Sequence, residues 1–264
     1  MEQRVALVTG GSSGIGYETA RSLAQAGLRV FTVSRRDFSA PWGEHLKADV
    51  TDESQARRAV EEAVARAGRL DVLVNCAGFG ISGAVEFTEG EDARQQLSVN
   101  FFGMDNMTRA ALPVFRRAGS GRVVNVSSVA AVAAIPFQTY YSASKAAINA
   151  YTCALANEVR PFGVSVTAVM PGDIRTGFTD ARKKSAAGDE VYDGRILRSV
   201  SKMERDERGG MRAETAGKFI AGVALRRHVK PLYAIGFSYQ CACLLCRLLP
   251  QSLSNRLIGE LYAK

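Results

Sequence analysis

The sequence predicts one α/β domain in which helices cover both faces of a doubly wound parallel sheet. Short runs rich in β-branched residues alternate with segments of helical length almost to the end of the chain. The runs are apolar on both faces, as strands of a parallel sheet covered on each side must be. A length of 264 residues, with 47% hydrophobic and 23% charged residues, suits a single globular domain over residues 1–264.

The elements follow one another in a regular order. The segments at 14–26, 52–67, 91–117 and 140–160 are each long enough for a crossover helix. This alternation is the pattern of the Rossmann fold, in which ligands bind at the carboxyl ends of the strands. The clearest strands are the runs "RVALVT", "RVFTVS", "LDVLVN", "GRVVNVSS" and "VSVTAVM".

One connection is too short for a crossover helix. The residues between "RVFTVS" and "LKADVTD" include Pro41, Trp42 and Gly43, which favour a loop. We therefore expect a loop or a single turn there, followed by a short third strand at 44–48.

The regular pattern breaks after "VMPGD". Residues 174–211 form a long, charged segment, which in a compact domain is typical of a lid over a binding site. A helix is expected at 213–226 and a last strand at "PLYAIG". Residues 238–264 should then form a tail of two short amphipathic helices separated by Pro250.

Composition excludes several function classes. No apolar run is long enough to span a membrane, and the amino-terminal residues lack the pattern of a signal peptide, so we expect a cytoplasmic protein. Five cysteines in apolar surroundings suit reduced thiols, and with only two histidines in the chain we expect no metal at Cys241, Cys243 and Cys246. The net charge of +8 lies mostly in loops without interleaved aromatic residues, so we expect no nucleic-acid partner.

A glycine-rich loop follows the first strand and opens the first helix. In "TGGSSGIG", Gly10, Gly14 and Gly16 permit a tight turn and close approach to a pyrophosphate, which the helix N-terminus attracts. In the first turn of a βαβ unit this motif predicts a dinucleotide site. Its other expected cofactor contacts are Ser12, Ser13 and Ile15.

The end of the second strand predicts which dinucleotide binds. Ser34 stands where an acid commonly binds the adenosine ribose, and Arg35 and Arg36 follow it. A guanidinium matches the geometry of a phosphate, whereas an acid would repel it. We therefore expect NADP(H) rather than NAD, although Asp37 could alter this register.

Two adjacent tyrosines precede a lysine in "TYYSASK". A helix turns about 100° per residue, so Lys145 lies about 40° around the helix from Tyr141 but about 140° from Tyr140. A nearby cation favours phenolate and so lowers the pKa of a tyrosine, which is about 10 in water. We therefore expect Tyr141, and not Tyr140, to exchange protons with a substrate.

These motifs together resemble the short-chain dehydrogenase/reductase family from Val5 to about Gly236. In "NCAG", Cys76 replaces the second asparagine of the family's commoner Asn-Asn-Ala-Gly, while Asn75, Ala77 and Gly78 match it. The matching motifs are "TGGSSGIG", "ADV", "NCAG", "VNFFG", "VVNVSS", "YYSASK" and "MPGDIRT".

The resemblance implies a role for each matching position. Asn100, Ser128, Tyr141 and Lys145 match the catalytic tetrad, with Ser128 binding the substrate oxygen and Asn100 holding a water that links Lys145 to solvent. Strand periodicity alone cannot choose between Ser128 and Ser127. Asn100, Tyr141 and Lys145 would also contact the cofactor, as would Asp49, Val50, Asn75, Ala77, Gly78, Pro171, Gly172, Ile174 and Thr176.

The substrate is expected to be lipophilic. The residues that follow the catalytic strands are apolar, which favours a hydrophobic alcohol or ketone as the substrate. The alternative is that these side chains only pack the core. They are Phe79, Ile81, Val129, Ala130, Ile135 and Phe137. Similarity to hydroxysteroid and retinol dehydrogenases favours a steroid-like secondary alcohol or ketone. The alternatives are a 3-ketoacyl-thioester reductase and a non-catalytic nucleotide sensor, which commonly lacks the tyrosine or lysine.

Partners can be predicted only by analogy. The resemblance implies a homo-oligomer, a dimer or tetramer, formed through the helices at 91–117 and 140–160. The apolar tail at 238–264 could border the pocket, form an interface or rest on a membrane surface.

Overall fold

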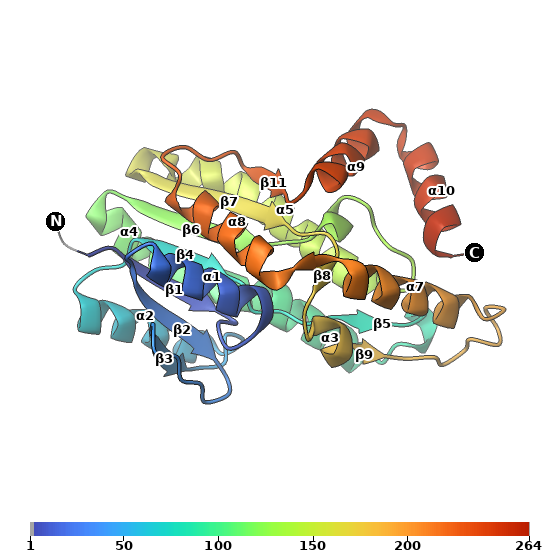
Figure 1. Cartoon of the computed structure of the whole chain (residues 1–264), viewed down its shortest axis with the longest axis horizontal. Coiled ribbons are helices and arrows are strands. Elements are labelled where there is room, and N and C mark those ends of the chain that lie inside the picture. Colours follow the sequence, from blue (N-terminus) through green and yellow to red (C-terminus); the bar gives the residue numbers. More distant parts are fainter. Residues whose placement is uncertain (1–2, 264) are drawn as a thin grey trace.

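The computed structural model describes residues 3–263 and confirms the doubly wound parallel sheet (Figure 1). All neighbouring strands of the seven-stranded sheet run parallel. The expected domain limits at residues 1–2 and 264 lie outside the described residues. In spatial order the strands are β11 (Leu232–Ala234), β7 (Val164–Met170), β6 (Gly121–Val126), β4 (Val72–Asn75), β1 (Val5–Thr9), β2 (Arg29–Ser34) and β3 (Glu44–Lys47).

Helices cover both faces of this sheet (Figure 1). One face carries α1 (Gly14–Gln25) and α8 (Ala213–Leu225), which pack together over a core that includes Val8, Val74 and Ile220. The opposite core includes Leu7, Phe31 and Phe115. It lies under α2 (Glu53–Ala67), α4 (Gly103–Ala118) and α5 (Thr139–Val159).

The short connection between β2 and β3 contains no helix, as the sequence predicts. The chain runs from β1 outward to β3 and then returns to β4 on the other side of β1. Such a reversal opens a crevice at the carboxyl ends of the strands, between β1 and β4. This is where a doubly wound sheet binds its ligands.

The helix expected at 91–117 is interrupted. The structure has α3 (Gly90–Leu97), then a π-helical turn at Ser98–Phe102, then α4. The π-helical turn could not be predicted, because its residues are compatible with an ordinary helix. Turns of this kind often lie at functional sites. Three short 3₁₀ helices occur at Val85–Phe87, Val129–Ala131 and Arg160–Phe162.

The segment at 174–211, called the lid below, is more regular than its charge suggests. It contains β8 (Ile174–Arg175), α6 (Phe178–Ala181), β9 (Lys183–Lys184) and the long helix α7 (Arg195–Gly209). Two further short strands hold it to the body: β5 (Ile81–Ser82) pairs with β9, and β10 (Met211–Arg212) pairs with β8.

The tail forms α9 (Phe237–Leu248) and α10 (Gln251–Tyr262), which meet at Pro250 and extend from the body as a hairpin (Figure 1). Tyr239 and Tyr262 face inward and are half-buried. The hairpin also exposes large apolar side chains, namely Phe237, Leu244, Leu245, Leu248, Leu253, Leu257 and Leu261.

Candidate active site

Ser128 and Tyr141 meet at the carboxyl end of the sheet. Ser128 follows β6, where its hydroxyl accepts a hydrogen bond of 3.1 Å from the Ala130 amide. Tyr141 lies in the first turn of α5 and hydrogen-bonds to the Ser128 side chain. The pair can therefore bind one oxygen atom from two sides.

The structure also separates Ser128 from Ser127. The Ser127 hydroxyl points to α5 and donates a hydrogen bond of 2.9 Å to the Lys145 carbonyl oxygen. Ser127 thus fixes the strand to the helix, while Ser128 faces Tyr141. This choice depends on the turn after β6, which strand periodicity does not describe.

Burial controls the acidity of the tyrosine and the lysine. It raises the pKa of Tyr141 to about 12, although the hydrogen bond with Ser128 opposes this shift. Burial also lowers the pKa of Lys145 to about 8. The pKa of Tyr141 is thus raised and not lowered as the sequence predicts, because desolvation is the largest of its causes and Lys145 is not among them.

Asn100 lies in the π-helical turn and is fully engaged by its neighbours. Its side-chain nitrogen donates to the Phe79 carbonyl oxygen and the Ser144 hydroxyl, each at 3.1 Å. Its side-chain oxygen accepts from the Phe79 amide at 3.0 Å. A Cβ atom on Gly78 would lie 3.1 Å from the Asn100 oxygen and 3.8 Å from the Lys145 nitrogen, so all three residues border one space.

The glycine loop has the shape that a dinucleotide site needs. Gly10 and Gly14 have φ of +66° and +55°, a conformation that side chains rarely adopt. A Cβ atom on Gly16 would lie 2.3 Å from the Gly10 carbonyl oxygen, so α1 packs closely under the loop. An open cavity of about 360 Å³ is lined by Ser12, Ser13, Gly14, Tyr17, Glu18, Thr176, Gly177 and Ala213.

At the end of β2 two arginines are available to an anion. Arg35 and Arg36 are exposed, and neither forms an ion pair with another described residue. Asp37 instead forms an ion pair of 2.8 Å with Lys47, and the hydrogen bond from Lys47 lowers the pKa of Asp37. The Ser34 hydroxyl donates to the Arg36 carbonyl oxygen at 3.0 Å, which orders this turn.

Other residues that the sequence predicts to contact the cofactor lie in the core or near the ends of the strands. The Asn75 amide nitrogen donates to Thr108 at 3.0 Å and to Asn125 at 2.9 Å, so this side chain lies inside the core. Asp49 accepts a hydrogen bond from the Thr51 amide, and Val50 is buried against Gly103. Ala77 lies on the loop after β4, Pro171 and Gly172 lie on the loop after β7, and Ile174 begins β8.

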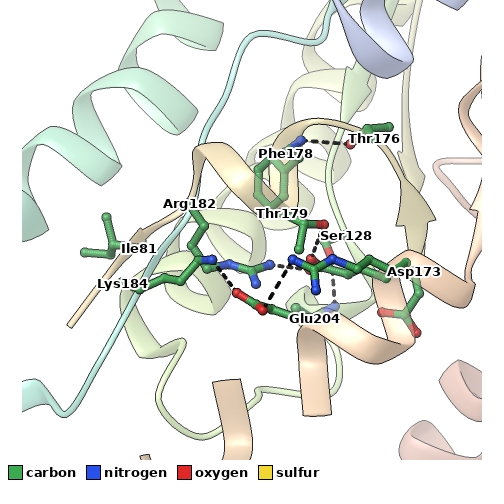
Figure 2. Close-up of polar contacts among 12 residues, drawn as sticks. Ile81, Ser128, Asp173, Thr176, Phe178, Thr179, Arg182, Lys184 and Glu204 are labelled. Atoms are coloured by element: carbon green, nitrogen blue, oxygen red, sulfur yellow. Dashed lines mark hydrogen bonds and ion pairs between the residues drawn. The ribbon is translucent and has the colours of Figure 1, made fainter. Parts of the chain in front are cut away.

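The lid places further residues near Tyr141 that the sequence did not indicate. The Phe178 ring lies 5.7 Å from the Tyr141 ring, centroid to centroid, and the Arg182 guanidinium lies 5.5 Å from the Phe178 ring. Arg182 is 4% exposed and forms an ion pair with Glu207 of α7. Lys184 forms a second ion pair with Glu204, so the lid strand is fixed to α7 (Figure 2).

Asp173, between β7 and β8, completes this group. Its carboxylate accepts a hydrogen bond of 2.5 Å from the Tyr239 hydroxyl of α9. Burial raises the pKa of Asp173. The charges of Asp173, Arg182 and Glu207 all act on Tyr141. Asp173 lies inside a family motif of the sequence, but no motif indicated its partner Tyr239, which comes from the tail.

Fold and site together define a class of protein, an oxidoreductase that uses a nicotinamide cofactor. A sequence profile described as "short chain dehydrogenase" matches residues 4–187. The chain belongs to the short-chain dehydrogenase/reductase family, as its motifs predicted.

Individual proteins agree with this membership. A 3-ketodihydrosphingosine reductase of Bacteroides thetaiotaomicron is 42% identical over 86% of both chains. A putative ketoacyl reductase of granaticin polyketide synthesis from Streptomyces violaceoruber is 41% identical over 67% of this chain and 76% of its own. The solved structure of ElxO with NADP bound is 26% identical, with a TM-score of 0.75 over 91% of this chain and 100% of that one.

Residues 3–263 lack two kinds of feature, a membrane-spanning helix and a metal-binding cluster. No described helix is long and apolar enough to cross a membrane. In the same part of the chain, no group of histidine, cysteine and acidic residues could hold a metal ion. Of the tail cysteines, Cys241 is exposed, Cys243 is buried and Cys246 is half-buried.

Proposed function

We propose that the protein reduces a long-chain amino ketone of the 3-ketodihydrosphingosine type to a secondary alcohol, with NADPH as the cofactor. The hydrogen-bonded pair of Ser128 and Tyr141 carries the proposal, because it provides a site for one carbonyl oxygen. The 42% identity to a reductase of this substrate supports the choice of ketone. Enzymes that share this much sequence over most of their length commonly share a reaction, and the site has the groups the reaction needs.

The chain's own residues supply the proton and hold the oxygen. A bound nicotinamide would supply the hydride that adds to the carbonyl carbon. Ser128 would donate a hydrogen bond to the ketone oxygen and stabilise the negative charge that develops there as the C=O π bond breaks. Tyr141 would transfer its hydroxyl proton to that oxygen, and Lys145 would favour the resulting phenolate.

The protonated state of Tyr141 favours the direction of reduction. With a pKa raised to about 12 by burial, the tyrosine is protonated at neutral pH. A protonated tyrosine is ready to act as an acid toward an alkoxide, whereas alcohol oxidation would first require that proton to leave. Reduction is therefore the proposed direction.

The free arginines after β2 support NADPH over NADH. Arg35 and Arg36 have no acidic partner among the described residues, and Asp37 is already paired with Lys47. Two available guanidinium groups suit the extra phosphate of NADP(H). The glycine loop and the adjoining cavity fit the rest of the dinucleotide.

Apolar side chains on both sides of the site support a lipophilic substrate. Ile135 and Phe137 pack against Ile196 and Met203 of α7. On the other side, a cluster under α9 includes Val129, Val132, Met170, Ala234, Tyr239 and Cys243. The lid lies over Tyr141 in this structure, so we expect these apolar surfaces to separate when a long alkyl chain binds between them. A polar sugar would gain little from them.

A second candidate function is reduction of a 3-ketoacyl thioester, which the similarity to a polyketide ketoacyl reductase favours. The steroid-like ketone that the sequence favoured stays a prediction. A substrate panel separates the three: NADPH absorbance is followed with a long-chain 3-keto amino alcohol, acetoacetyl thioesters and a steroid ketone. We expect the highest kcat/KM with the amino ketone. Turnover of the thioester alone would reject the proposed function.

The finer expectations on partners also stay proposals. We expect a dimer or tetramer formed through the segments at 91–117 and 140–160. Phe102 in the π-helical turn and Phe162 in the 3₁₀ helix after α5 are exposed near them. Analytical ultracentrifugation would measure the oligomeric state. We also propose a cytoplasmic location and a peripheral membrane contact through the α9–α10 hairpin. Cell fractionation would test both.

A further inference from the structure

The surroundings of Tyr141 contain more negative charge than ketone reduction should favour. The charges of Asp173 and Glu207 both raise the pKa of Tyr141. Reduction places negative charge first on the substrate oxygen and then on the tyrosine oxygen. Carboxylates nearby oppose both changes unless a cation balances them. The charge of Arg182 lowers that pKa and Arg182 pairs with Glu207, so Asp173 is the negative charge near Tyr141 that remains to be balanced when the substrate is bound.

Two of the three carboxylates in this region form ion pairs with cations, and the third does not. Three carboxylates face this region, from Asp173, Asp206 and Glu207, and two of them have cations. Lys202 forms an ion pair of 2.9 Å with Asp206, and Arg182 forms one with Glu207. Asp173 has only the Tyr239 hydroxyl as a side-chain partner among residues 3–263, through one of its two carboxylate oxygens. It is the carboxylate of the three that forms no ion pair among the described residues, although the charge of Lys202 also acts on it.

Arg182 provides a second, independent observation. Its side chain is 1% exposed, and one terminal nitrogen contacts Glu207. The Nε atom and the other terminal nitrogen are buried without a hydrogen-bond partner in the described part of the chain. The guanidinium lies over Phe178, which in turn contacts Tyr141. Buried donors without acceptors are costly, so a polar group that binds there would be held strongly.

We propose that Asp173 and Arg182 form a subsite for the polar head of an amino alcohol, beside the carbonyl that Ser128 and Tyr141 bind. An ammonium on the carbon next to the ketone would pair with Asp173. A neighbouring hydroxyl would accept hydrogen bonds from the free nitrogens of Arg182. This inference rests on the proposed function and names the part of the substrate that the site recognises.

The subsite explains how one fold could select among lipophilic ketones. A steroid ketone or an acyl thioester has no cation beside its carbonyl, so each would leave Asp173 buried without a counter-charge. An amino ketone balances that charge close to the oxygen that becomes negative. Selectivity would then come from the head group, while the alkyl chain contributes apolar burial.

Paired substrates test the ammonium contact. The long-chain 3-keto amino alcohol is compared with its N-acetyl amide, which has the same chain and hydroxyl but no charge. In Asp173→Asn, kcat/KM for the amine should fall about tenfold to a hundredfold, whereas that for the amide should change less than about threefold. Asp206→Asn is the matched control, because it removes a neighbouring carboxylate that Lys202 already pairs; it should treat both substrates as wild type does.

A second pair tests the contact with Arg182. The same amino ketone is compared with an analogue that lacks the hydroxyl. In Arg182→Lys, which keeps the charge but removes the forked donors, the hydroxyl-bearing substrate should lose its advantage over the analogue. An equal loss with both substrates would assign Arg182 to holding the lid and would overturn this half of the subsite.

Inhibition of the wild-type enzyme tests the ammonium contact without a variant, which matters if a variant does not fold. A long-chain 2-amino-1-alcohol and its N-acetyl amide are measured as inhibitors, and the amine should bind at least about tenfold more tightly. Equal inhibition would overturn the ammonium site. Failure of the proposed function has a different signature, since the wild-type enzyme would then reduce neither the amino ketone nor its amide.

Discussion

The side-chain nitrogen of Lys145 lies 5.7 Å from the centre of the Tyr141 ring. It donates a hydrogen bond of 2.8 Å to the carbonyl oxygen of Val126, at the end of β6. The lysine is therefore held at the junction of strand and helix, on the same face of α5 as the tyrosine. This relationship supports the prediction that Tyr141, and not Tyr140, exchanges protons with a substrate.

Replacing each tyrosine in turn tests that conclusion. Tyr141→Phe removes the proton donor and should lower kcat by about a hundredfold to ten-thousandfold, the usual contribution of a positioned acid. Tyr140→Phe should retain activity within about threefold, because Tyr140 lies on another face of the helix. Steady-state NADPH oxidation measures both variants. Equal losses in the two would contradict the assignment.

Activity should fall in the alkaline range because of Lys145. Burial lowers its pKa to about 8, so the lysine is charged below that pH and becomes neutral above it. Charged Lys145 favours the phenolate that remains after Tyr141 has given up its proton. For ketone reduction, kcat/KM should therefore be level below about pH 8 and decrease up to about tenfold per pH unit above it.

The control for this pH dependence is Lys145→Arg. An arginine stays charged throughout the accessible range, so the remaining activity should no longer decrease near pH 8. A thiolate at Cys76 would raise the pKa of Lys145. Burial raises the pKa of the Cys76 thiol to about 12, so this thiol stays neutral near pH 8. A profile that decreases at the same pH in Lys145→Arg would assign the titration to another group.

The fold could be predicted because its signals are local. Strand runs such as "VSVTAVM" and the glycine loop identify themselves by composition, and the structure places β7 over all seven of those residues. The helix α7 was missed although Ile196, Val200 and Met203 have helical spacing and form its buried face. The many charges around them obscured the pattern; Glu204, Glu207 and Arg208 pair across the lid.

The site was predictable only where one element carries it. Tyr141 and Lys145 share a helix, so periodicity related them correctly. Asp173, Arg182 and Tyr239 come from a loop, the lid and the tail, and no short motif joins them. Their meeting depends on tertiary packing, and so does the large desolvation that raises the pKa of Tyr141.

Cofactor choice should depend on the arginines after β2. Arg35→Ala removes a cation that has no acidic partner among the described residues, and the KM for NADPH should rise about tenfold to a hundredfold. The KM for NADH should change by less than about threefold. Asp37→Asn is the control: Asp37 pairs with Lys47, so its loss should leave the preference for NADPH in place. A parallel rise in both KM values would contradict phosphate recognition.

The glycine loop should not tolerate a methyl group at position 16. In Gly16→Ala the new carbon would lie 2.3 Å from the Gly10 carbonyl oxygen, which forces the loop away from α1. Such overpacking costs about 1–3 kcal/mol, and the Kd for NADPH should rise. Gly222→Ala in α8 is the matched control, because no atom lies within 4 Å of its new carbon. Calorimetric titration and thermal unfolding would compare the two.

The ion pair between Arg182 and Glu207 should show the difference between a buried and an exposed pair. The two side chains are 1% and 14% exposed. Glu207→Gln would leave the guanidinium buried without its counter-charge, and the free energy of unfolding should fall by about 3–5 kcal/mol. Glu91→Gln is the control, since Glu91 and its partner Arg94 are 79% and 72% exposed; its effect should stay below about 1 kcal/mol.

A double substitution then separates stability from function. Because desolvation offsets much of the attraction in a buried pair, Arg182→Met combined with Glu207→Leu should recover most of the stability lost in Glu207→Gln. Urea unfolding measures that recovery. The double variant should nevertheless remain poor at reducing the amino ketone, because it lacks the donors of Arg182. Recovery of activity together with stability would mean that this pair serves the lid alone.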